Sequence, residues 1–158
     1  MMAPSYPTTN VIYAMVLAIF LQLVPIQGTL FHWKPNFILL VVIVLIINYP
    51  HKYGLGFAAL MGLLADGIFG TTLGHFMFVF TLCGGILELL SRWTHYFELS
   101  YRIVAVFLVT LFAAFTQTLV ANMQGISVPL DYLPGMTIIS ALLLPFIERF
   151  IGRKHETQ

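Results

Sequence analysis

Charged side chains are scarce in this chain. Seven Lys and Arg residues and six Asp and Glu residues make up 8% of the 158 positions, whereas soluble domains carry about 25% charged residues. Hydrophobic residues make up 59% of the chain, and the mean hydropathy is +0.94. Because so few charges cannot keep the surface of a folded domain in water, we expect an integral membrane protein.

Other absences exclude functional classes. The net charge of +1, with no dense Lys and Arg cluster before the last ten residues, leaves no electrostatic footprint for nucleic acid. The single cysteine, Cys83, cannot form an internal disulfide. The five histidines form neither an HExxH motif nor another ligand cluster, and no nucleophile with a base or pair of carboxylates stands out. We therefore expect neither an enzyme nor a metal or cofactor site.

Apolar stretches between the charges predict six membrane helices joined by short loops. These stretches lie at about 8–24, 35–49, 53–69, 73–90, 103–121 and 134–151. A helix needs roughly 20 residues to cross the bilayer, so six spans leave no room for a soluble domain. The predicted fold is a compact all-α bundle, a single membrane-embedded domain over residues 1–158.

The second stretch is short for a membrane span. Its fifteen residues, 35–49, extend only about 22 Å as a helix. We therefore expect its ends to be buried in protein, to snorkel, or to thin the bilayer.

Basic residues divide unequally between the two sides that six spans create. The side of both termini receives Lys52, Arg92, Arg102, Arg149, Arg153 and Lys154, and the other side receives Lys34 alone. This asymmetry places both termini in the cytoplasm by the positive-inside rule. The first 33 residues carry no charge, whereas a secretory signal opens with Lys or Arg, so we expect the amino terminus to be retained.

Asp66 is the most informative charged residue because it lies inside an apolar stretch. An ionisable group at the centre of a membrane helix costs about 2.5 to 3.5 kcal/mol, so we expect Asp66 to face other protein groups. We predict that it pairs with Lys34 or accepts hydrogen bonds from Asn36, His32 or His75. Binding of a proton or cation is the functional alternative, although no second acid or relay accompanies this carboxylate.

Small residues recur every four positions around Asp66. The repeat consists of Gly54, Ala58, Gly62, Asp66, Gly70 and, beyond the turn, Gly74. Residues at this spacing share one helix face, and small side chains let neighbouring backbones approach closely. Packing within the bundle is the favoured interpretation, and a subunit interface is the alternative.

Four other polar residues lie in or near the spans. Glu88 and Arg92 are four positions apart, which favours a helix-end ion pair. Gln22 and Gln117 lie at depth, where amides can hydrogen-bond across helices.

Two motifs resemble the MreD family, small multi-pass proteins of bacterial inner membranes that determine rod shape. One is Lys34-Pro35-Asn36 before a short helix that closes at Tyr49-Pro50-His51; the other is Gly62-Leu63-Leu64-Ala65-Asp66 leading to Gly70-Thr71-Thr72-Leu73-Gly74. The resemblance covers about a quarter of the chain and departs from the family at Phe69, where relatives often carry Ser. The candidates for partner contact or packing are Lys34, Pro35, Asn36, Gly62, Asp66, Gly70, Leu73 and Gly74.

The resemblance implies a non-enzymatic scaffold or regulatory subunit of the elongation complex that directs lateral peptidoglycan synthesis. It implies as partners MreC, a RodA-type glycosyltransferase with its class B penicillin-binding transpeptidase, and the MreB cytoskeleton, directly or through another subunit. It also implies a fold similar to the substrate-binding components of energy-coupling-factor transporters. A small-molecule-binding transporter subunit is the alternative, favoured by that fold and by Gln22, Asp66 and Gln117. Membrane lipid surrounds the bundle in either case, and homo-oligomerisation stays open.

Overall fold

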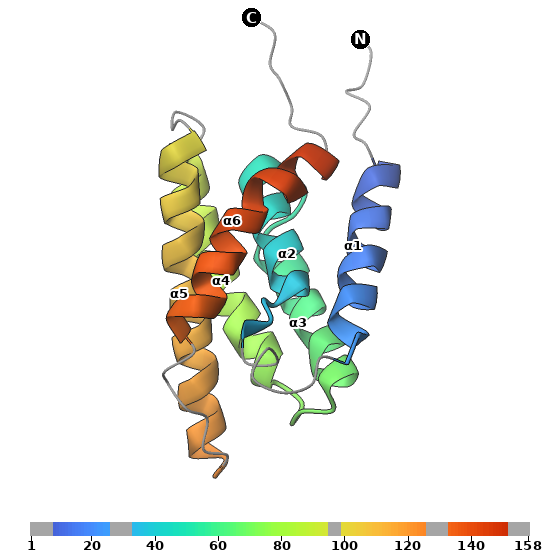
Figure 1. The fold of residues 1–158 in the computed structure, drawn as a ribbon, viewed down its shortest axis with the longest axis vertical. Helices are drawn as coiled ribbons and strands as arrows, with labels where there is room; N and C mark the ends of the chain where they lie inside the picture. The colour runs from blue at the N-terminus through green and yellow to red at the C-terminus, as the bar shows by residue number, and fades with distance from the viewer. Residues whose placement is uncertain (1–7, 26–32, 95–98, 126–132, 152–158) are drawn as a thin grey trace, which may run out of the picture.

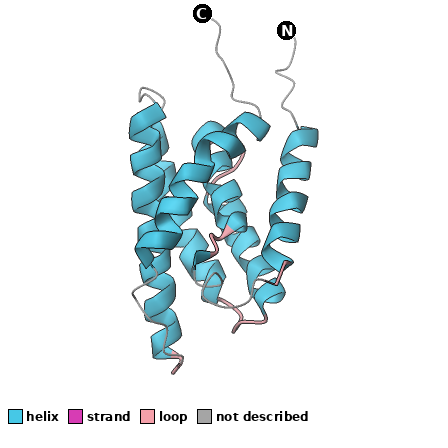
Figure 2. Cartoon of the chain, viewed as in Figure 1, coloured by secondary structure: helices cyan, strands magenta, loops and turns pink. Residues whose placement is uncertain are grey.

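Six helices make up nearly all of the part of the chain that the structure describes. The computed structural model describes residues 8–25, 33–94, 99–125 and 133–151, and Figure 2 shows helices, turns and loops in these ranges. The helices are α1 (Thr8–Leu23), α2 (Phe37–Asn48), α3 (Leu55–Phe69), α4 (His75–Thr94), α5 (Leu99–Met123) and α6 (Leu133–Ile151). Each one coincides with a predicted stretch to within a few residues, which confirms the all-helical expectation.

Successive helices alternate in direction, so the first turn of α1 and the last turn of α6 lie at the same end of the bundle (Figure 1). We call this end the tail end. The turn between α3 and α4 lies at the opposite end, together with the last turns of α1 and α5 (Figure 1). We call that end the turn end.

Helix α2 is the centre of the bundle. It contacts α1, α3, α4 and α6, and every residue from Ile38 to Ile47 is buried. A helix that is apolar on all sides is stable only inside such a shell. Its 12 residues extend only about 18 Å, but its two capping residues, Asn36 and Tyr49, are buried. Of the three ways in which so short a helix can be accommodated, the structure shows burial of its ends in protein.

The outer helices expose large apolar side chains. Phe20 on α1, Leu63 on α3, Leu108 on α5 and Phe146 on α6 are all exposed. Helices α5 and α6 contain stretches long and apolar enough to cross a membrane, whereas α1 to α4 are shorter apolar helices. So many exposed large apolar side chains are unfavourable in water and favourable in lipid. These faces are those of a membrane protein.

Candidate functional site

The carboxylate of Asp66 caps the first turn of α4. Its Oδ1 accepts hydrogen bonds from Thr71 Oγ1 at 2.9 Å and from the Phe76 N–H at 2.7 Å. Its Oδ2 accepts from the N–H groups of Gly74 at 2.9 Å and Met77 at 3.3 Å. These backbone donors have no partner within their own helix, and the carboxylate also meets the positive end of the helix dipole. Asp66 is 1% exposed, so it faces inward as predicted.

These four donors leave the carboxylate little capacity for another ligand. A carboxylate offers about four lone-pair positions, and each oxygen of Asp66 already accepts two hydrogen bonds. Among the described residues, no group of three or more His, Cys, Asp and Glu side chains could hold a metal ion. The geometry therefore supports a structural role for Asp66 over binding of a cation.

The predicted pairing of Asp66 with Lys34 is wrong. The Lys34 ammonium donates instead to the carbonyl oxygens of Gln22 at 2.7 Å and Val24 at 2.8 Å, at the end of α1. Unsatisfied carbonyls and the negative end of a helix dipole attract a cation to this position, and partial burial lowers the pKa of Lys34. In return, Gln22 Oε1 accepts from the Phe37 N–H at 3.0 Å and caps the start of α2. Gln22 thus makes the cross-helix bond predicted for it.

Asn36 and His75, two other partners predicted for Asp66, do not bind it in the structure. Asn36 is the N-cap of α2, where its Oδ1 accepts from the Leu39 N–H at 3.1 Å. His75 makes no hydrogen bond to Asp66, and its buried Nδ1 has no partner within the described ranges. His32 lies outside the described residues. The physical reason is proximity, because the turn that follows α3 brings unpaired backbone N–H groups directly to the carboxylate.

The turn between α3 and α4 is stabilised by hydrogen bonds and presents an exposed leucine. Gly70 has φ 62° and Gly74 has φ 103°, a region of backbone conformation that favours glycine. At the end of α5, Gln124 Nε2 donates to Thr72 Oγ1 at 2.7 Å. Leu73 belongs to this turn and is 83% exposed.

The small-residue face of α3 packs against α4. A Cβ atom added to Gly62 would lie 2.5 Å from the Cα of Met77, and one added to Gly84 would lie 2.6 Å from the Cβ of Ala58. The two backbones are therefore in direct contact at Gly62, and the face meets α4 rather than a second subunit.

Helices α3 and α4 also hold each other's first turns. Glu88 Oε2 on α4 accepts from the Leu55 N–H at the start of α3, at 3.3 Å, as Asp66 on α3 does for α4. The predicted partner of Glu88, Arg92, has its side chain outside the described part. Gln117 is half-buried, and no hydrogen bond joins its side-chain amide to another described residue.

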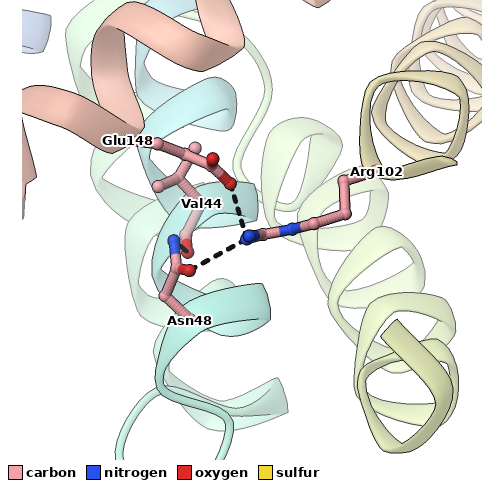
Figure 3. Close-up of polar contacts among 4 residues, drawn as sticks. All are labelled: Val44, Asn48, Arg102 and Glu148. Atoms are coloured by element: carbon pink, nitrogen blue, oxygen red, sulfur yellow. Dashed lines mark hydrogen bonds and ion pairs between the residues drawn. The ribbon is translucent and has the colours of Figure 1, made fainter. Parts of the chain in front are cut away.

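A buried ion pair joins three helices at the tail end (Figure 3). Arg102 Nη2 on α5 lies 2.5 Å from Glu148 Oε1 on α6, and the two side chains are 7% and 4% exposed. The same nitrogen donates to Asn48 Oδ1 on α2 at 2.9 Å, and Asn48 Nδ2 donates to the Val44 carbonyl at 3.0 Å.

This pair is not predicted from the sequence, in which Arg102 counts among the charges that set topology and Glu148 has no predicted partner. One signal was available, because the buried face of α6 recurs every three or four residues: Thr137, Ser140, Ala141, Leu144, Glu148 and Ile151. That period places Glu148 inward, although it does not identify Arg102 as the partner.

The comparisons with known proteins identify one family. No solved structure matches this chain, so the similarity to energy-coupling-factor components stays a prediction. The family model MreD, described as rod shape-determining protein MreD, matches residues 6–153, far more than the segment that carried the resemblance. Its members are non-enzymatic proteins of the cytoplasmic membrane. The chain therefore belongs to the MreD family of rod shape-determining proteins.

Proposed function

We propose that this protein is a scaffold or regulatory subunit of the elongation complex that directs lateral peptidoglycan synthesis. Membership of the MreD family supports a role in determining rod shape. The finer proposal is that it acts through contacts with MreC, with the RodA-type glycosyltransferase and with its class B transpeptidase. The link to the MreB cytoskeleton is made directly or through another subunit.

We propose that all six helices lie in the inner membrane and that both termini are cytoplasmic. The alternating helix directions support an even number of crossings (Figure 1), and the excess of Lys and Arg on the side of the termini supports the orientation. The turn end then faces the periplasm. A reporter-fusion map with an external reporter at residue 158 would contradict this placement.

The observation that carries the proposed partner contact is the exposure of Leu73 on a turn stabilised by hydrogen bonds. Asp66 and two glycines of positive φ hold the turn, and the Thr72–Gln124 bond connects it to the end of α5, where Met123 is 88% exposed. Apolar side chains on a hydrogen-bonded turn can be buried by a partner with little loss of ordering entropy.

The remaining motif residues are buried or engaged in contacts near the turn end, so they position Leu73 without contacting a partner. Pro35 and Asn36 are buried, and Lys34 is engaged by the end of α1. Gly62 is buried against α4. We therefore assign Leu73 to partner contact, and we assign Lys34, Pro35, Asn36, Gly62, Asp66, Gly70 and Gly74 to positioning the turn end.

Depletion of the protein tests the function. We expect rod-shaped cells to become round, and MreC to co-purify with the protein in mild detergent. Normal cell shape after depletion, together with a vitamin-like ligand found on the purified protein by mass spectrometry, would favour the transporter alternative. The transporter alternative relied on Gln22 and Asp66 as polar groups that could bind a ligand, but both side chains already accept hydrogen bonds from backbone groups.

A further inference from the structure

An apolar groove of about 270 Å³ opens between α1, α2 and α6. Its floor includes the buried residues Ala14, Ala18 and Val41. Its walls include Leu17, Phe146 and Phe150, which are 45%, 73% and 51% exposed. Large side chains thus stand on either side of a floor built largely from alanine.

The lining of the groove indicates the chemistry of its occupant. All of the lining residues are apolar, which suits an acyl chain and offers no hydrogen bond to a polar ligand.

A positive charge lies beside the groove at the tail end. Arg149 is exposed and belongs to the same turn of α6 as the wall residues Phe146 and Phe150. Two further basic residues, Arg153 and Lys154, follow shortly in the sequence. Basic groups next to gaps between membrane helices attract anionic lipid headgroups.

We propose that this groove binds one acyl chain of an anionic phospholipid whose phosphate contacts Arg149. The proposal rests on the placement of the tail end at the membrane surface, which is part of the proposed function. A lipid bound here would fill the space between α1 and α6 and would hold the peripheral helix α1 against the bundle.

Native mass spectrometry of the full-length protein tests this proposal. The protein is stripped of lipid in detergent and supplied with equal amounts of phosphatidylglycerol and phosphatidylcholine that carry the same acyl chains. We expect one retained lipid per protein and at least a tenfold preference for phosphatidylglycerol. Retention of both lipids in equal amounts by the unchanged protein would overturn the proposal.

Two variants distinguish binding of the acyl chain from recognition of the headgroup. Ala18→Leu fills the floor of the groove and is expected to lower lipid retention at least tenfold, whereas Val104→Leu on the exposed face of α5 leaves retention unchanged. Arg149→Gln is expected to keep the lipid and to lose the preference for phosphatidylglycerol, whereas Lys52→Gln, which removes another exposed cation, keeps it.

Unchanged retention in Ala18→Leu, or unchanged selectivity in Arg149→Gln, would overturn the proposal. If Ala18→Leu has a lower helical content by circular dichroism, the smaller change Ala14→Val is measured in its place with the same expected loss. Failure of the proposed function would appear separately, because cell shape and MreC co-purification are measured independently of lipid retention.

Discussion

Glu148 Oε1 lies 2.5 Å from Arg102 Nη2, with both side chains almost completely buried, and this pair joins α6 to α5 across 46 positions of sequence. Asn48 brings α2 into the same contact. The ion pair and this hydrogen bond thereby connect α2, α5 and α6 at the tail end.

Removing one partner of this pair should be costly. We expect Glu148→Ala to reduce the free energy of unfolding by about 3–5 kcal/mol, because it leaves the Arg102 charge buried without its counter-charge. Replacing both residues, as in Arg102→Met with Glu148→Leu, should restore most of the loss. Unfolding in lipid-free detergent, followed by circular dichroism, measures this. A double variant no more stable than Glu148→Ala would contradict it.

The carboxylate of Asp66 should stabilise the α3–α4 hairpin through backbone donors. We expect Asp66→Asn to reduce the free energy of unfolding by roughly 2 kcal/mol, because the amide nitrogen cannot accept hydrogen bonds and the charge at the helix start is lost. A double-variant cycle with Lys34→Gln tests the absence of an ion pair. The two effects should add to within about 0.5 kcal/mol, and a larger coupling energy would mean that the two side chains interact.

Gly62 and Gly67 lie on the same helix and should respond oppositely to an added methyl group. Gly62→Ala places a Cβ atom 2.5 Å from a backbone atom of α4, so we expect a loss of about 1–3 kcal/mol from overpacking. A Cβ atom added to Gly67 would meet no other atom within 4 Å, so Gly67→Ala should increase stability by up to about 1 kcal/mol. The denaturation midpoints in detergent show whether each variant is more or less stable than the parent protein. Equal effects at the two positions would disprove the α3–α4 contact.

Leu73 should matter for partner binding and little for folding. We expect Leu73→Ser to keep the unfolding midpoint of the parent protein, to lower MreC co-purification several-fold, and to fail to restore rod shape in depleted cells. The matched control is Leu55→Ser, a partly exposed leucine at the tail end, which should support rod shape. Full restoration of rod shape by Leu73→Ser would show that Leu73 is not part of the partner interface.

The lengths of the apolar runs and the prolines and charges between them predicted all six helices to within a few residues. The cost of a charge in lipid also predicted that Asp66 faces inward. These are properties of single residues and their near neighbours, so they can be read along the chain. The resemblance at Lys34 to Asn36 and at Gly62 to Gly74 likewise pointed to the family that the comparison identified.

The partners of the polar groups were decided by the tertiary structure. Asp66 binds the start of α4 instead of Lys34, and Lys34 binds the end of α1, because each helix end leaves backbone groups that the nearest polar side chain satisfies. Arg102 and Glu148 meet because α5 packs against α6, and the end of α2 brings Asn48 to the same place. A sequence determines which groups must avoid lipid, but which group satisfies each of them depends on the distances set when the helices pack.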